Sequence, residues 1–218
     1  MFKDRTDAAR QLAAILNRYK GVRGGIVLSL PNGGVPLGST ISRALKLPLD
    51  VFVAKRVSIP WVPGVTLGAA TETGLVRLNH ELVQWACVPS EELAGFVLQA
   101  KKDARRLGQL FHAESPHPDF AGKTILLVDD GARTGATIMA AAEALRRLNP
   151  ERLIAALPVA PQSIARELKG LVDEQVILQP TSDIPWISRN YEEFNPISEE
   201  NVLDALHACT GNLIRRTL

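Results

Sequence analysis

Short runs of consecutive apolar residues recur along this chain, and segments with helical periodicity lie between them. Runs that are apolar throughout, rather than alternating with polar positions, are typical of strands buried on both faces of a parallel sheet. The sequence predicts five such strands, at residues 26–30, 49–54, 124–128, 153–159 and around 176–178.

Two segments between these strands predict helices. In residues 90–111, apolar side chains recur at steps of three and four, which places them on one face of a helix. A second helix is predicted to begin near Gly135 and to stop at Asn149 and Pro150. Because strands and helices alternate, we expect an α/β fold with a doubly wound, mainly parallel sheet and helices on both faces.

Two further segments complete the expected architecture. Residues 67–71 and 75–79 are joined by a short turn and predict a small hairpin. Towards the C-terminus the chain changes character, with aromatic residues such as Trp186 standing among charges. We therefore expect a small cap, at about residues 181–218, over one edge of the sheet.

Composition excludes several classes of protein. Hydrophobic residues make up 46% of the chain and charged residues 22%, a balance typical of a globular domain. The formal charge of +2 is too small to suggest a nucleic-acid binder, and no apolar stretch is long enough for a membrane span. We expect a cytoplasmic protein with neither nucleic acid nor membrane as a partner. Since no repeat or linker divides it, residues 1–218 are expected to form one domain with a core at about 20–180.

The end of the predicted strand at 124–128 carries unusual chemistry. Asp129 and Asp130 follow it directly, and a loop with two glycines and two threonines then leads into a helix. Such a loop and the helix N-terminus together form a nest of N–H groups for a phosphate. The carboxylates would repel that phosphate, but they suit hydroxyl groups or a hydrated Mg²⁺ beside it. The pattern predicts a sugar-phosphate site, although an acidic pair after a strand is also common as a solvated helix cap.

The run ILLVDDGARTGAT, residues 125–137, closely resembles the phosphoribosyl pyrophosphate (PRPP) motif of type I phosphoribosyltransferases. The likeness extends over most of the chain, and the opening Phe-x-Asp-Arg, residues 2–5, resembles a subgroup whose acceptor is unknown. The resemblance implies that Asp129 and Asp130 hold the ribose hydroxyls and, through water, Mg²⁺. It also implies that the 5′-phosphate is cradled by Gly131, Ala132, Arg133, Thr134, Gly135, Ala136 and Thr137.

A second strand end matches the pyrophosphate loop of the same family in position. It contains Pro31, Asn32, Gly33 and Gly34, whose backbone amides are expected to contact the diphosphate. In the family this loop often holds a cis peptide bond that does not involve proline. The subgroup usually has Arg where this chain has Asn32, so a positive charge on the diphosphate is missing. An ordinary turn after a strand is the alternative interpretation.

The segment at about 55–79 resembles the family's flexible lid, and it opens with two cations. Lys55 and Arg56 end the predicted strand at 49–54, from where either side chain could close onto the diphosphate. A solvated strand end is the alternative for both cations.

The resemblance implies a Mg²⁺-dependent transferase that moves the 5-phosphoribosyl group from PRPP to a nitrogenous base and releases pyrophosphate. Asp129, Asp130, Lys55 and Arg56 are its expected catalytic residues, and PRPP and a small-molecule acceptor its partners; a homodimer is left open. One alternative is a regulator of the same fold that senses PRPP or a nucleotide without turnover. Another is a hydrolase that would release inorganic phosphate instead of pyrophosphate.

Overall fold

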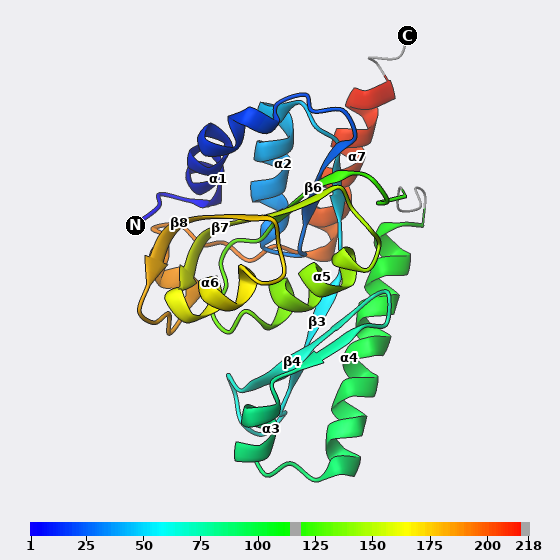
Figure 1. The fold of residues 1–218 in the computed structure, drawn as a ribbon, viewed down its shortest axis with the longest axis vertical. Helices are drawn as coiled ribbons and strands as arrows, with labels where there is room; N and C mark the ends of the chain where they lie inside the picture. The colour runs from blue at the N-terminus through cyan, green and yellow to red at the C-terminus, as the bar shows by residue number, and fades with distance from the viewer. Residues whose placement is uncertain (114–118, 215–218) are drawn as a thin grey trace.

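The main body of the molecule is a five-stranded parallel sheet covered by helices (Figure 1). The computed structural model describes residues 1–113 and 119–214. The strand order is β2-β1-β6-β7-β8, and every neighbouring pair is parallel. These strands are β1 (Gly25–Ser29), β2 (Leu49–Val51), β6 (Thr124–Val128), β7 (Arg152–Pro161) and β8 (Glu174–Thr181).

Helices cover both faces of this sheet, which confirms the predicted doubly wound α/β fold. Alternate residues of a strand enter different cores, so that Ile26 and Val27 of β1 are both buried but face opposite helix layers. One layer contains α1 (Arg5–Ile15), α2 (Gly34–Leu45) and α7 (Glu199–Ile214). The other contains α5 (Ala136–Arg146) and α6 (Gln162–Leu168).

The strand order places a topological switch point between β1 and β6. Chain connections leave these two neighbouring strands towards opposite faces of the sheet, because α2 follows β1 and α5 follows β6. Ligands of open parallel sheets bind at such a point, outside the carboxyl ends of the strands. The loops that carry the two predicted motifs begin at these strand ends.

The predicted strand at 49–54 is in fact two strands in different sheets. β2 ends at Val51, and β3 (Ala54–Ser58) begins a second, antiparallel sheet. Lys55 and Arg56 therefore lie inside β3, and the prediction that they end a strand of the main sheet was wrong. Phe52 and Val53 between the strands are fully buried. An apolar run of this kind does not reveal that the chain passes from one sheet to another.

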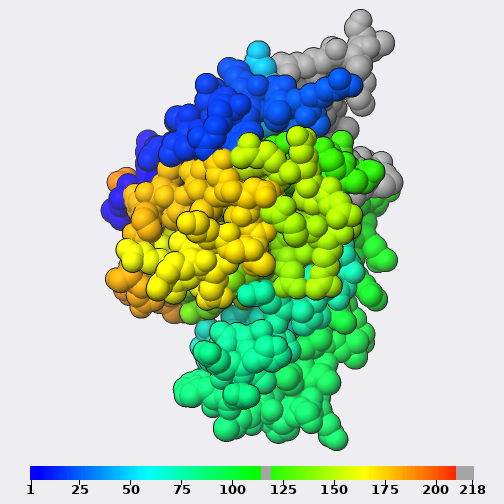
Figure 2. All heavy atoms as spheres, viewed as in Figure 1, coloured from blue at the N-terminus to red at the C-terminus, as the bar shows by residue number. Residues whose placement is uncertain are grey.

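The second sheet belongs to a unit, here called the hairpin unit (residues 54–111), that projects from the main body (Figure 2). β4 (Thr66–Thr71) and β5 (Val76–Leu78) pair antiparallel, which confirms the predicted hairpin. α3 (His80–Trp85) and α4 (Ser90–Phe111) complete the unit. The last turns of α4 pack in the main core, and its earlier turns pack on the hairpin. α4 therefore joins the unit to the main body along its length.

The start of the chain meets the segment that precedes α7 at one side of the main body. Phe2 donates its backbone N–H to the carbonyl of Asn190 at 2.8 Å, and its ring packs on that of Tyr191. A short 3₁₀ helix, Ile187–Asn190, precedes this contact. The last four residues of the predicted cap lie outside the described part of the chain. Within the described part, no helix has both the length and the apolar character that crossing a membrane requires.

Candidate active site

The two predicted loops, the start of the hairpin unit and the C-terminal segment enclose one cavity of about 750 Å³. It brings together nearly all of the predicted site residues. Gly34 and Ala136 are exceptions: they are the first residues of α2 and α5 and do not line the cavity. The lining residues from the prediction are Pro31, Asn32, Gly33, Lys55, Arg56, Asp129, Asp130, Gly131, Ala132, Arg133, Thr134, Gly135 and Thr137. Their roles stay predictions.

The loop after β6 adopts the backbone that its glycines allow. Gly131 has a φ of 152° and Gly135 a φ of 71°, and Gly135 is the N-cap residue of α5. The backbone N–H of Ala132 donates to the carbonyl of Val159 at 3.0 Å, which ties the loop to β7. This amide is therefore used within the protein, and donors for an anion come from the part of the loop nearer the N-terminus of α5.

The two acids at the end of β6 differ in their surroundings. Asp130 is 7% exposed and paired with a guanidinium group, whereas Asp129 is only partly buried. Burial raises the pKa of Asp129, and the negative charge of Asp130 raises it further. Burial also raises the pKa of Asp130, but the guanidinium of Arg5 acts against that shift. Without a ligand, the cavity therefore disfavours a second negative charge at Asp129.

We expect Asp129→Asn to stabilise the ligand-free protein at about pH 8, with an advantage that shrinks towards about pH 4. Because the folded state holds the Asp129 proton to a higher pH than the unfolded state does, stability falls as pH rises between the two pKa values. Urea unfolding across this pH range measures the effect. Asp204→Asn, at an exposed position on α7, is the control. If the stability of Asp129→Asn depended on pH as that of the wild type does, the raised pKa of Asp129 would be contradicted.

The loop after β1 lies directly against the acids. A Cβ atom on Gly33 would lie 2.6 Å from Cγ of Asp130, closer than atoms can approach, so only glycine fits there. The peptide bond between Pro31 and Asn32 is cis. Asn32 donates through Nδ2 to the carbonyl of Ile197 at 2.8 Å. Its amide thus holds the C-terminal segment beside the cavity and brings no charge to the loop.

Three cations lie on the side of the cavity formed by the hairpin unit and the loop after β6. Lys55 and Arg56 come from β3 and Arg133 from the loop. Arg133 donates through Nη2 to the carbonyl of Gly64 at 2.6 Å, which joins the predicted lid to the predicted phosphate loop. Burial lowers the pKa of Lys55. The cavity lining therefore carries positive charge, although Asn32 itself has none.

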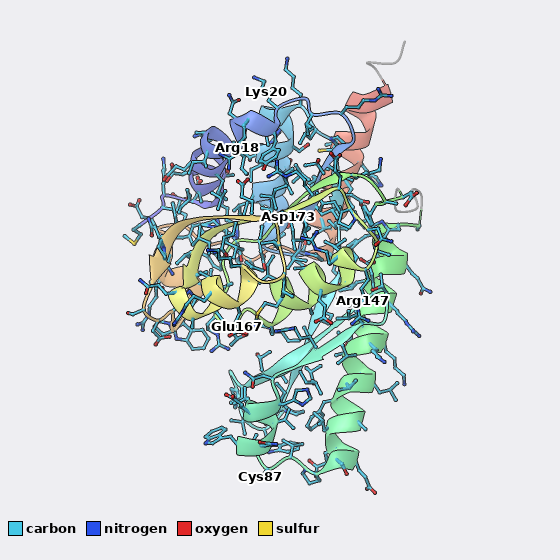
Figure 3. All side chains as sticks on the ribbon, viewed as in Figure 1. Arg18, Lys20, Cys87, Arg147, Glu167 and Asp173 are labelled. Carbon is cyan, nitrogen blue, oxygen red and sulfur yellow. The ribbon has the colours of Figure 1, made fainter. Side chains whose placement is uncertain are left out.

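The hairpin unit is also attached to the main body away from the cavity. Arg77 of β5 pairs with Glu143 of α5 at 3.2 Å and with Glu167 of α6 at 3.9 Å. Glu167, labelled in Figure 3, accordingly lies on the side of α6 that faces the unit. Cys87 marks the opposite, far end of the unit (Figure 3). The mobility of the predicted lid stays a prediction.

Several residues at the site were not predicted from the sequence: Ser58 and Thr66 line the cavity, and Arg5 contacts Asp130. Arg5, at the start of α1, is 8% exposed and contacts Oδ2 of Asp130 through both Nε and Nη2, each at 2.9 Å. A signal was present, because the opening Phe-x-Asp-Arg segment was part of the family resemblance. The spacing of 125 residues between Arg5 and Asp130 hid the contact.

Comparison with protein families identifies the family of this chain. The phosphoribosyl transferase domain matches residues 2–186. The chain belongs to this family. The match covers β1 to β8, and thus both loops and the acid pair. The expected family and fold are confirmed.

Solved structures share the fold of this chain. The crystal structure of TT1426 from Thermus thermophilus superposes with a TM-score of 0.76 at 29% identity, over 95% of this chain and 98% of that chain. The AQ2163 protein from Aquifex aeolicus shares the fold at 10% identity, with a TM-score of 0.52 over 94% of this chain and 85% of that chain.

A curated relative that matches in sequence is much longer than this chain. It is the protein of Mycobacterium tuberculosis (strain ATCC 25618 / H37Rv) named "Putative phosphoribosyl transferase Rv0571c", which is 30% identical over 95% of this chain and 47% of its own length. The same identity and coverage hold for "Putative phosphoribosyl transferase MT0597" of strain CDC 1551 / Oshkosh. The chain thus spans about half the length of the curated relatives it matches.

Proposed function

We propose that this protein transfers the 5-phosphoribosyl group of PRPP to a nitrogenous acceptor and releases pyrophosphate. The observation that carries the proposal is the composition of the cavity at the switch point. A glycine-rich loop that leads into a helix N-terminus lines it together with two carboxylates. Three cations line it too, Arg133 from that loop and Lys55 and Arg56 from β3. A phosphorylated sugar with a diphosphate on C1 is complementary to this arrangement of charges.

Each part of the cavity has a role in this proposal. Thr134 and Thr137 donate to the 5′-phosphate together with the N-terminus of α5, while Asp129 and Asp130 accept hydrogen bonds from the ribose hydroxyls. Lys55 and Arg56 face the diphosphate, whose negative charge grows as the bond to C1 breaks. Charges placed in advance at both ends of that bond favour the transition state over the ground state.

The proposed Mg²⁺ fits the donor set if most of its ligands come from the substrate. Within residues 1–113 and 119–214, no three His, Cys, Asp or Glu side chains gather into a metal site. Mg²⁺ is commonly held by one or two carboxylates together with phosphate oxygens and water. Asp129 and Asp130 are the carboxylates that would hold it here, through water. When bound, the ion would neutralise charge on the departing diphosphate.

We expect PRPP with Mg²⁺ to stabilise the protein by about 2.7 kcal/mol at a hundred times its dissociation constant. Thr134→Val should lose about 1.5–3 kcal/mol of binding free energy for both PRPP and ribose 5-phosphate, because both carry the 5′-phosphate. Thermal melts with each ligand measure the shift. Thr40→Val is the control, since Thr40 lies on α2 and bonds the carbonyl of Pro36.

Product analysis separates the proposed transferase from its alternatives. The transferase should release pyrophosphate from PRPP when a suitable purine, pyrimidine or other nitrogen acceptor is present. A sensor would bind PRPP and release nothing with any acceptor, and a hydrolase would release inorganic phosphate. A melting temperature that PRPP does not move would contradict the proposed substrate itself.

A further inference from the structure

Arg5 forms a buried ion pair with Asp130, and a buried ion pair is a costly way to stabilise a fold. A buried ion pair gains little stability over apolar side chains of the same volume, because both charges lose their water. Yet both partners here are about 90% buried, with side-chain exposures of 10% each. The pair also stands on the wall of the ligand cavity, since Asp130 lines it. The position suggests a use for the pair beyond holding the fold together.

The contacts of Arg5 fix both the place and the direction of the Asp130 carboxylate. Nε and Nη2 each contact Oδ2 at 2.9 Å, so Arg5 does not use Oδ1. Gly33 also approaches this carboxylate, and Oδ2 most closely, so that no side chain would fit there. The hydroxyl of Tyr191 donates to the backbone carbonyl of Asp130 at 2.6 Å. Asp130 is thereby held by three separate segments of the chain.

Arg5 is itself held by the C-terminal segment. Its Nη1 donates to the carbonyl of Asn195 at 2.7 Å, and its guanidinium carbon lies 3.7 Å from the ring centroid of Phe194. The planar guanidinium can satisfy these contacts at once because its donors point in fixed directions. The ammonium group of a lysine could keep the positive charge beside Asp130, but it could not make all of these contacts at once.

We propose that Arg5 is a positioning residue, which orients the Asp130 carboxylate so that it accepts from a ribose hydroxyl of the bound sugar phosphate. The inference rests on the proposed function, because it takes the ligand to be a ribose 5-phosphate derivative. Arg5 acts only through Asp130 and does not contact the phosphate. Its loss should therefore weaken recognition of the sugar hydroxyls and leave recognition of the phosphate intact.

Two ligands that differ only in their hydroxyl groups test this. Calorimetry should compare ribose 5-phosphate with tetrahydrofurfuryl phosphate, which keeps the ring and the phosphate but lacks the hydroxyls. We expect Arg5→Gln to lower the affinity for ribose 5-phosphate by about 10–100-fold. The affinity for tetrahydrofurfuryl phosphate should stay within about twofold of the wild-type value. Arg5→Lys should recover part of the loss. Arg10→Gln, at an exposed position of the same helix, should change the affinity for neither ligand.

A double variant covers the case in which Arg5→Gln does not fold, since it leaves Asp130 buried without a partner. Arg5→Gln with Asp130→Asn removes both charges, and it should discriminate between the ligands no worse than Asp130→Asn alone. The inference would be overturned if the double variant discriminated between the ligands less well than Asp130→Asn alone. It would also be overturned if Arg5→Gln lowered the affinity for both ligands equally. If the wild type binds neither PRPP nor ribose 5-phosphate, the proposed function fails and the role of Arg5 fails with it. Wild-type binding with an Arg5→Gln variant of equal affinity contradicts only the inference.

Discussion

Replacing Gly33 by alanine is expected to lower the free energy of unfolding by about 2–4 kcal/mol and to abolish most ligand binding. The new methyl group would meet the Asp130 carboxylate, with Cγ at 2.6 Å. That carboxylate cannot move aside cheaply, because Arg5 holds it. Either the loop after β1 or the buried ion pair has to give way. Urea unfolding and ribose 5-phosphate calorimetry measure the two effects.

Gly95→Ala is the matched control for this substitution. Gly95 lies on the exposed side of α4, and a Cβ atom added there meets nothing within 4 Å. Alanine should stabilise the helix at this site by about 0.5–1 kcal/mol. If Gly33→Ala were as well tolerated as Gly95→Ala, the close approach of the two loops would be wrong.

Phe52→Ala is expected to cost about 3–5 kcal/mol, since a fully buried aromatic side chain leaves a cavity when it is removed. Phe52 occupies the step between β2 and β3, where its N–H donates to the carbonyl of Ser29 at 3.0 Å. It packs in the core on the side of α5 and α6. Its loss should loosen the hairpin unit, and hydrogen exchange in residues 54–71 should speed up.

Leu98→Ala provides the comparison for Phe52→Ala. Leu98 is 53% exposed on α4, so truncation should change stability by no more than about 0.5 kcal/mol. Equal losses of stability in the two variants would contradict this prediction. Unchanged hydrogen exchange in the hairpin unit after Phe52→Ala would show that Phe52 does not fix the unit to the main body.

Local pattern was enough to predict the main sheet and both loops. The run at 124–128 is β6 residue for residue, and the residues after it line the cavity as the motif suggests. A run that is apolar at nearly every position is typical of a strand buried on both faces, as β6 is. The hairpin was equally visible, since its turn and its two strands are adjacent in the chain.

What the sequence did not reveal depends on contacts between distant residues. The break after Val51 cannot be read from a run in which Phe52 and Val53 are as apolar as their neighbours. Nor does spacing indicate that Asn32 bonds the carbonyl of Ile197, 165 residues away. A polar side chain near a strand end can serve a ligand or another part of the chain, and only the fold decides between them.

Segments from the beginning of the chain and from residues 191–195 meet at the acid pair, which has a consequence for synthesis on the ribosome. Arg5 is made before any strand of the main sheet, but the carbonyl that accepts from its Nη1 belongs to a residue 190 positions later. A nascent chain in which β1, β6 and β7 are already complete still lacks Tyr191 and Asn195, and thus two of the contacts around Asp130. A ligand that binds only the finished site stabilises by mass action the molecules that include these residues, and it gives no such support to shorter ones.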